Sequence, residues 1–184
     1  MTVPIEVESD LVARLRAGDR AAVEEAYVAH HAPVRAFARR LLGDAAAAED
    51  LVHDAFVALP DAIRRFRGEA SLRSFLIGVA ANRARRHIRT AMRRRAMTER
   101  FAAQPRVEAS DPTEELARRR LADRLSAALD ALPLDQRVAF VLCEAEQRTS
   151  VEVAAIVGVP EGTVRTRLFH AKRKLREQLE DIHE

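Results

Sequence analysis

The chain has 184 residues, enough for one domain or two small ones, and 48% of them are hydrophobic, so it can bury a real core. Ala, Leu, Arg and Glu dominate, Trp is absent, and alternating β-branched runs are missing, which predicts an all-α fold. The single cysteine, Cys143, excludes a disulfide framework and a multi-cysteine zinc site. No apolar run approaches the ~18 residues of a membrane span, and the acidic start MTVPIEVESD does not resemble a signal peptide, so we expect a cytoplasmic protein.

The charge is distributed unevenly along the chain. The formal net charge is only +3, with a pI near 9.7. Residues 1–62 hold 6 Arg against 11 Asp and Glu, whereas residues 64–100 hold 12 Arg against 2 Glu. This asymmetry predicts one acidic contact surface and one surface that binds a polyanion.

Hydrophobic periodicity predicts a series of helices after a loose tail at residues 1–9. Pro33 separates two of them, although a proline is also tolerated in the first turn of a helix. The predicted N-terminal helices are Asp10–Ala17, Ala21–His31, Pro33–Leu42 and Ala45–Leu59.

The helix over residues 45–59 is the most acidic of these. Leu51 belongs to its apolar inner face, while Asp50, His53 and Asp54 point the other way. With Glu49, these side chains suggest a metal site, but no second His/carboxylate cluster exists elsewhere to complete a coordination shell. We therefore expect no metal and no cofactor, and favour an acidic face that docks on a basic partner over a merely solvated one.

The next predicted helix begins at Ser71, after a loop through Gly68, and runs to about Thr90. Its helical period separates a buried apolar stripe from an exposed polar face. The stripe is Leu72, Phe75, Leu76 and Val79, and the exposed face carries Asn82, Arg85 and Arg89 together with Gly78 and Ala81. Small residues at 78 and 81 would let a backbone or a base approach closely, and Asn and Arg suit nucleic-acid contacts. The alternative is an ordinary solvated, arginine-rich helix end.

Residues 92–112 are polar, contain Pro105 and Pro112, and show no sustained hydrophobic period, so we interpret them as a flexible linker. Two further helices are predicted beyond it, Thr113–Leu132 and Leu134–Glu146, with Leu116, Leu121, Leu125 and Leu129 as core contacts of the first. The predicted architecture is two small helical domains, residues 10–91 and 113–184, joined by the linker.

The stretch from Thr149 to Arg176 predicts a helix-turn-helix. Thr149 and Glu152 form a capping-box pattern, and Gly158 supplies a left-handed residue between the two helices. The second helix buries Val164, Leu168, Ala171 and Leu175 and carries no acid between Thr163 and Arg176. The candidate DNA-reading residues on this basic helix are Arg165, Thr166, Arg167, Phe169, His170 and Arg173. The alternative is an amphipathic helix pair with a solvated basic face.

Three stretches of the chain together resemble one known protein family. GDRAAVEEAYVAHHAPVRAFARRLLGDAAAAEDLVHDAFVAL resembles the polymerase-binding start of bacterial sigma factors of the extracytoplasmic-function (ECF) group. RFRGEASLRSFLIGVAANRARRHIR is similar to the promoter-melting segment of that group, and ALDALPLDQRVAFVLCEAEQRTSVEVAAIVGVPEGTVRTRLFHAKRKLRE to its promoter-binding domain. The resemblance covers about residues 10–90 and 114–180.

The resemblance implies an alternative sigma factor with core RNA polymerase, promoter DNA and an anti-sigma factor as partners, and without catalytic activity. Asp50, Leu51, His53 and Asp54 would dock on polymerase, and the helix-turn-helix would read the −35 element as duplex. The residues that would capture an unstacked base of the −10 element are Arg67, Gly68, Ser71, Asn82, Arg85 and Arg89.

The sequence departs from the family pattern at several positions. Phe75 and Ile77 replace a usual Trp and a usual aromatic, Gln147-Arg148 replaces a usual Gly-Leu, and His170 stands where Arg is common. Arg83 and Arg86 replace residues that are often apolar and acidic.

Two other functions remain as alternatives. A stand-alone helix-turn-helix regulator would bind operators by itself, but it would have no need for the Asn/Arg helix in residues 64–90. An enzyme using Glu49, Asp50, His53 and Asp54 lacks a nucleophile motif, a phosphate loop and a second carboxylate cluster.

Overall fold

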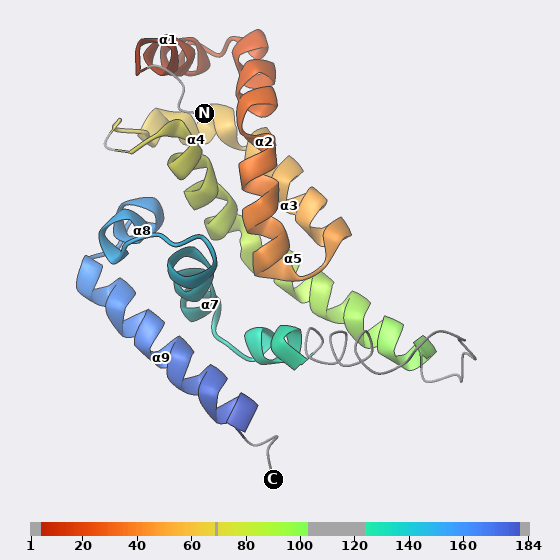
Figure 1. The fold of residues 1–184 in the computed structure, drawn as a ribbon. Coiled ribbons are helices and arrows are strands. Elements are labelled where there is room, and N and C mark those ends of the chain that lie inside the picture. Colours follow the sequence, from red (N-terminus) through yellow and green to blue (C-terminus); the bar gives the residue numbers. More distant parts are fainter. Residues whose placement is uncertain (1–4, 69, 103–123, 181–184) are drawn as a thin grey trace, which may run out of the picture.

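The computed structural model describes residues 5–68, 70–102 and 124–180, and every regular element in these ranges is helical (Figure 1). The predicted all-α fold class is therefore confirmed. Among the described residues, no helix combines the length and the apolar character that crossing a membrane requires.

The N-terminal half is a helical bundle built on one long helix, α5. Its elements are α1 (Ile5–Arg16), α2 (Arg20–Leu42), α3 (Ala45–Val57), α4 (Leu59–Ala62), the short 3₁₀ turn η1 (Ile63–Arg65) and α5 (Leu72–Ala102). Both α2 and α3 pack against α5. The buried stripe that α5 turns toward them repeats every three or four residues and consists of Leu72, Leu76, Ala80, Ala84, His87 and Ala91.

The predicted break at Pro33 is wrong, because α2 continues through this residue as one helix. A proline inside a helix costs about 3 kcal/mol, since it removes a backbone hydrogen bond and crowds the preceding turn. Val34 and Phe37 on the same helix are fully buried. Burying a side chain of this size is worth about 1.5–3 kcal/mol, so tertiary packing offsets the local penalty.

The helix predicted to end near Thr90 is also longer than expected, since α5 runs to Ala102 and includes the first eleven residues of the predicted linker. No glycine or proline interrupts residues 79–104, and Ala, Met and Arg favour the helix. Arg94 lies 3.3 Å from a carboxylate oxygen of Asp44 and 3.6 Å from one of Asp50, which holds this extension near α3. Residues 103–123, with the rest of the linker, lie outside the described residues, and the domain boundary stays a prediction.

The C-terminal half contains a helical segment at residues 124–130, α7 (Leu134–Phe140), a π-helical turn η2 (Val141–Ala145), α8 (Ser150–Val157) and α9 (Glu161–Glu180). Leu129 packs against a small apolar cluster that includes Ala171 and Leu175. Leu125, predicted as a core contact, is 41% exposed, so that prediction is wrong. Leu116 and Leu121 lie outside the described residues.

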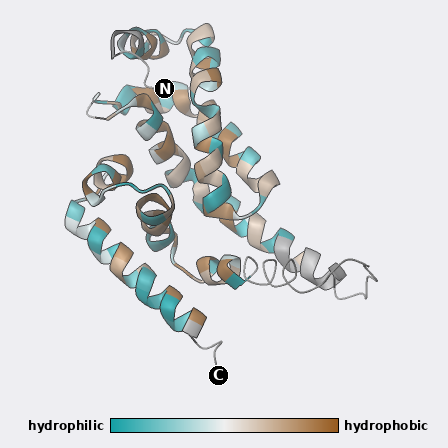
Figure 2. Ribbon diagram, viewed as in Figure 1, coloured by the Kyte–Doolittle hydropathy of each residue, from teal (hydrophilic) through white to brown (hydrophobic). Residues whose placement is uncertain are grey.

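The main hydrophobic core extends through both halves of the chain. Leu15 of α1, Phe37 of α2 and Val164 of α9 belong to one cluster of buried apolar side chains. In the ribbon coloured by hydropathy, much of α9 is hydrophilic along its length (Figure 2). The two halves thus share a core while α9 keeps a polar surface.

Candidate nucleic-acid interfaces

The helix-turn-helix forms as its capping residues predict. The Thr149 backbone N–H donates to the Glu152 carboxylate at 2.8 Å, and the Glu152 N–H donates to the Thr149 hydroxyl at 3.3 Å. The Thr149 N–H and the Thr149 hydroxyl both donate to the Glu152 carboxylate, which holds the pKa of Glu152 below its ordinary value. Gly158 ends α8 with a φ of 70°, in the left-handed region that only glycine adopts without cost.

The outer face of α9 presents a large aromatic ring among basic side chains. Val164 and Ala171 are fully buried, whereas Leu168 is only partly buried. On the opposite face Phe169 is 63% exposed, and its ring meets His170 edge-on with centroids 5.6 Å apart. The other predicted base-reading residues on this helix are exposed or half-buried, namely Arg165, Thr166, Arg167 and Arg173.

Several cations of α9 are held in ion pairs within the chain. Arg165 pairs with Glu161 at 2.6 Å, and Arg173 lies 3.5 Å from Glu177. Two further pairs reach the preceding helices and join Arg167 to Asp135 and Lys172 to Glu144. Surface ion pairs are worth about 0–1 kcal/mol, so phosphate groups can displace these acids at little cost.

The second candidate nucleic-acid site is the loop between η1 and α5. Gly68 has a φ of 77°, and the Ser71 hydroxyl accepts a hydrogen bond from the Ser74 N–H at 3.2 Å, which is the predicted cap. Helix α1 braces both ends of the loop, since Arg16 donates to the Phe66 carbonyl and Glu8 accepts from the Leu72 N–H. Helix α1 therefore holds both ends of the loop, and it also lines the cleft of about 360 Å³ beside the loop.

The exposed face predicted for α5 is only partly exposed. Asn82, Arg85 and Arg89 reach solvent. Gly78 and Ala81 are buried, so their predicted exposure is wrong, and the backbone of α8 approaches Gly78 at Ile156. The prediction that position 78 admits a close backbone is confirmed by this contact.

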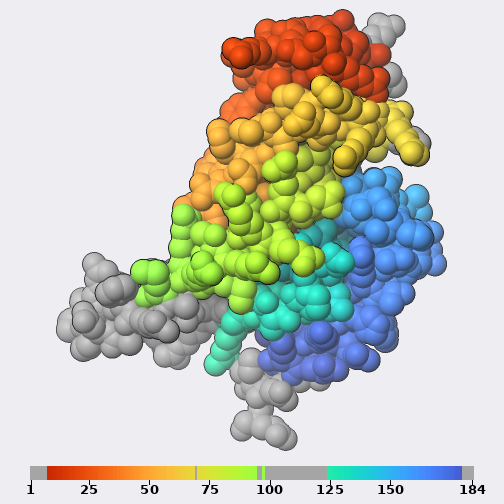
Figure 3. All heavy atoms as spheres, turned by 180° about the vertical axis from the view of Figure 1, so that it is seen from behind, coloured from red at the N-terminus to blue at the C-terminus, as the bar shows by residue number. Residues whose placement is uncertain are grey.

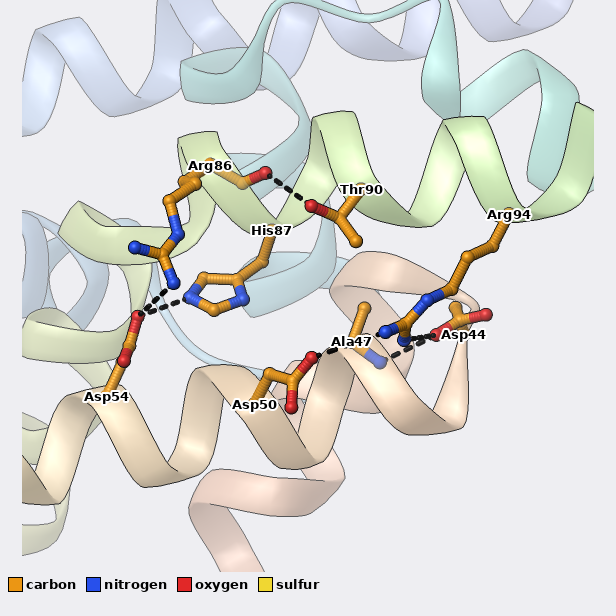
Figure 4. Close-up of polar contacts among 8 residues, drawn as sticks. All are labelled: Asp44, Ala47, Asp50, Asp54, Arg86, His87, Thr90 and Arg94. Carbon is orange, nitrogen blue, oxygen red and sulfur yellow. Dashed lines mark hydrogen bonds and ion pairs between the residues drawn. The ribbon is translucent and has the colours of Figure 1, made fainter.

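Two acidic residues of α3, Asp50 and Asp54, contact side chains of α5, so they are not simply solvated (Figure 4). Asp54 lies 2.7 Å from Nε2 of the buried His87 and 3.7 Å from Arg86, and Asp50 lies 3.6 Å from Arg94. Figure 4 shows that these partners all come from α5.

Leu51 has no exposed surface, which removes it from any docking surface, while Asp50 and His53 remain exposed. The Asp54 side chain keeps 30% of its area exposed. Of the residues predicted to dock, Asp50 and His53 are therefore open to a partner, and Asp54 is open only in part.

Sequence analysis missed His87 and the two residues, Arg40 and Glu146, that link the halves of the chain. His87 follows Ala80 and Ala84 at helical spacing, so the periodicity of α5 could have placed it on the buried stripe. No sequence signal pairs Arg40 with Glu146, because 106 positions separate them. Among the described residues, no group of three or more His, Cys, Asp or Glu side chains is arranged to hold a metal ion.

The fold and the basic surfaces of α9 and α5 are typical of a helical DNA-binding protein with a helix-turn-helix. Residues 26–94 match the family Sigma-70 region 2, and residues 122–175 match Sigma-70, region 4. The chain belongs to the sigma factors of the ECF group. As such, it is an alternative sigma factor that binds core RNA polymerase and directs promoter-specific initiation of transcription.

Relatives and solved structures agree with this membership. RNA polymerase sigma factor CarQ of Myxococcus xanthus is 31% identical over 92% of this chain and 95% of its own length. RNA polymerase sigma-H factor of Pseudomonas aeruginosa is 27% identical over 96% of both chains. The sigma factor RpoE of Bartonella quintana, solved with the anti-sigma factor NepR, is 26% identical with a TM-score of 0.54, and covers 85% of this chain and 96% of that one. CnrH, solved with the cytosolic domain of CnrY, shares the fold at 22% identity, with a TM-score of 0.61 over 95% of this chain and 98% of that one.

Proposed function

We propose that α9 reads the −35 element with Arg165, Thr166, Arg167, Phe169, His170 and Arg173. The observation that carries this proposal is the solvent-exposed Phe169 on the basic face of a correctly capped helix-turn-helix. An exposed aromatic ring beside arginines suits thymine methyl groups and guanine edges in a major groove. The ion pairs of Arg165, Arg167 and Arg173 hold these guanidinium groups at the surface of the protein.

The loop and the exposed side of α5 form the proposed −10 site. Arg67, Gly68 and Ser71 come from the braced loop, and Asn82, Arg85 and Arg89 come from α5. An amide and several guanidinium groups can bind the edge of an unstacked base and the phosphates beside it. Holding such a base offsets part of the free energy that opening the duplex costs.

The proposed polymerase-docking surface consists of Asp50, His53 and the exposed edge of Asp54 on α3. A carboxylate that is only 3.6 Å from Arg94 and still 56% exposed can exchange that arginine for a cation of the partner. This surface lies on α3, away from α9.

We further propose an anti-sigma factor as partner, because the sigma factor RpoE of Bartonella quintana was solved with one. The chain would act in the cytoplasm, where RNA polymerase works, and would carry no catalytic activity of its own.

Separate substitutions can test the −35 and docking assignments. Arg165→Ala with Thr166→Ala should lower transcription from a genomic-fragment library roughly 5- to 150-fold, because lost base contacts are worth about 1–3 kcal/mol. The same protein should co-elute with core polymerase as the parent does. Gln178→Ala, an exposed change on the same helix, is the matched control. Loss of polymerase binding by the double variant would contradict the assignment.

Asp50→Ala with His53→Ala should give the reverse pattern. Core polymerase binding should weaken in gel filtration, while the free chain keeps its affinity for duplex DNA. Asp61→Ala removes an exposed carboxylate from α4 and serves as control. Unchanged co-elution of the double variant would exclude α3 as the docking surface.

A further inference from the structure

Helix α1 precedes the residues that match the sigma family. The match to Sigma-70 region 2 begins at residue 26, whereas α1 ends at Arg16. Leu11, Val12 and Leu15 nevertheless pack α1 into the main core, so this helix is a fixed part of the bundle. In the space-filling view from behind, the red N-terminal atoms lie directly against the yellow segment between α3 and α5 (Figure 3). The contact of α1 with that segment therefore raises the question of what α1 does there.

The loop between η1 and α5 borders two clefts. Phe66, Arg67 and Ala70 line the cleft of about 360 Å³ beside α1, and the same three residues line a second cleft of about 300 Å³ that α5 also lines. The Phe66 side chain is buried, but Arg67 and Gly68 beyond it are exposed. A Cβ atom built on Gly68 would meet no atom of the described residues within 4 Å, apart from its chain neighbours. Packing alone therefore does not fix the loop beyond Phe66.

Two hydrogen bonds from α1 hold the ends of this loop. Arg16 donates to the backbone carbonyl of Phe66, and Glu8 accepts from the backbone N–H of Leu72, the first residue of α5. The helix dipole also favours a carboxylate at the N-terminus of a helix. Both bonds involve a charged side chain, which makes them stronger than hydrogen bonds between neutral groups. The loop thus takes its support from residues that lie 50 and 64 positions away in the chain.

Both hydrogen bonds end next to residues of the proposed −10 site. Arg67 directly follows the residue whose carbonyl Arg16 binds, and Ser71 directly precedes the residue whose N–H Glu8 binds. Among the described residues that line the cleft beside Asn82, none comes from α1, so Glu8 and Arg16 act on this site through the loop backbone. A loop that is already ordered loses less conformational entropy when it binds a base, which raises its affinity.

We propose that Glu8 and Arg16 are positioning residues for promoter melting, because they preform the loop that binds the unstacked base of the −10 element. This inference rests on the −10 assignment proposed above. The proposed −35 residues lie on α9 and the proposed docking residues on α3, so substitutions on α1 should leave duplex −35 binding and polymerase docking unchanged. The step that should change is the binding of the unstacked base.

The test compares promoter DNA with and without the captured base. The probe is a fork-junction DNA made from a promoter recovered from the genomic-fragment library, duplex upstream and single-stranded over the non-template −10 strand. A series of further probes each lacks one base of that strand. Fluorescence anisotropy measures the affinity of each probe for the holoenzyme of the full chain with core polymerase. The abasic probe that loses the most affinity for the parent holoenzyme identifies the captured base.

Substitutions on α1 should affect the intact fork and spare the abasic one. Glu8→Ala and Arg16→Ala should each weaken binding of the intact fork about 3- to 10-fold, because each removes one hydrogen bond that holds the loop. Binding of the abasic fork should not change, because it offers the ordered loop no base. Glu8→Gln keeps an acceptor for the Leu72 N–H and should recover most of the affinity. Asp10→Ala removes a carboxylate of the same helix that is 73% exposed, and is the matched control.

The outcomes separate a positioning role from a structural one and from a failed −10 assignment. Weaker binding of the intact fork alone supports positioning by α1. Equal weakening on the intact and abasic forks means that α1 only stabilises the bundle, which overturns the inference. Parent-like binding of both forks by the alanine variants also overturns it, while the −10 assignment stands. If no abasic probe binds the parent holoenzyme more weakly than the intact fork, the −10 assignment itself is wrong, and the inference fails with it.

Discussion

Gln147 occupies a strained backbone position just before the helix-turn-helix. Its φ is 54°, the only positive value among the non-glycine residues that the structure describes. A non-glycine residue in the left-handed region costs on the order of 1 kcal/mol. The Gln147 side chain recovers part of this cost, since its Nε2 donates to the Glu144 carbonyl at 2.6 Å. The strain explains why glycine is usual here in the ECF pattern that the sequence resembles.

Replacing this residue separates strain from hydrogen bonding. Gln147→Gly should stabilise the chain by about 0.5 kcal/mol, because relief of the strain exceeds the loss of one exposed hydrogen bond. Gln147→Ala keeps the strain and loses the bond, so it should be less stable than the parent. Urea unfolding measures both changes. A glycine variant less stable than the parent would show that the side-chain bond, and not the backbone strain, dominates.

Cys143 illustrates how burial controls reactivity. The thiol lies in the π-helical turn against the main core. Burial, together with the nearby Glu144 carboxylate, raises the pKa of Cys143 above its ordinary value. Little thiolate is therefore present near neutral pH, which makes this thiol slow to oxidise.

At the scale of elements, α3 is clamped to α5 by polar contacts as well as by its apolar face. Asp54 lies against the buried His87, and Asp50 lies near the partly exposed Arg94 (Figure 4). Since the His87 side chain is only 4% exposed, a lost partner there cannot be replaced easily by water. The same acidic helix thus holds the bundle together and offers its outer edge to a partner.

Two alanine substitutions on α3 should differ in their effect on stability. Asp54→Ala should lower the free energy of unfolding by about 1–3 kcal/mol, because it leaves a buried imidazole nitrogen unpaired. Asp50→Ala should change it by less than about 0.5 kcal/mol, as exposed pairs contribute little. Chemical denaturation gives both values. Equal effects of the two changes would mean that the Asp54–His87 contact does not stabilise the bundle.

At the scale of the whole molecule, one core joins both halves. Val138, Leu142 and Ile156 of the C-terminal half are buried in the same cluster as the helices of the N-terminal bundle. Elements that share a core lose their packing together, so their unfolding is coupled. We therefore expect the chain to unfold as one cooperative unit.

Calorimetry can test this cooperativity. The parent chain should unfold in a single transition whose calorimetric and van't Hoff enthalpies agree. Arg40→Ala removes the partner of the buried Glu146 and should split the unfolding into two transitions, one for each half. Two transitions already present in the parent chain would show that the halves fold independently.

The sequence by itself determined the local structure and the order of the functional parts. Thr149, Glu152 and Gly158 act through neighbours within a few residues, so the helix-turn-helix was predictable from their spacing. The apolar periods likewise identified the helical class, and the motifs identified the family. The length of α5 and the continuity of α2 at Pro33 were missed, because side-chain propensities and tertiary burial outweigh a local break signal.

Only the tertiary structure decided which surfaces are available. Gly78 and Ala81 share α5 with exposed polar residues, and nothing in the local pattern shows that another element packs against them. Arg40 and Glu146 meet across 106 positions, and Asp54 meets His87 across 33. Periodicity assigns a residue to a face of its own helix, but the partner of that face is set by the packing of the whole chain.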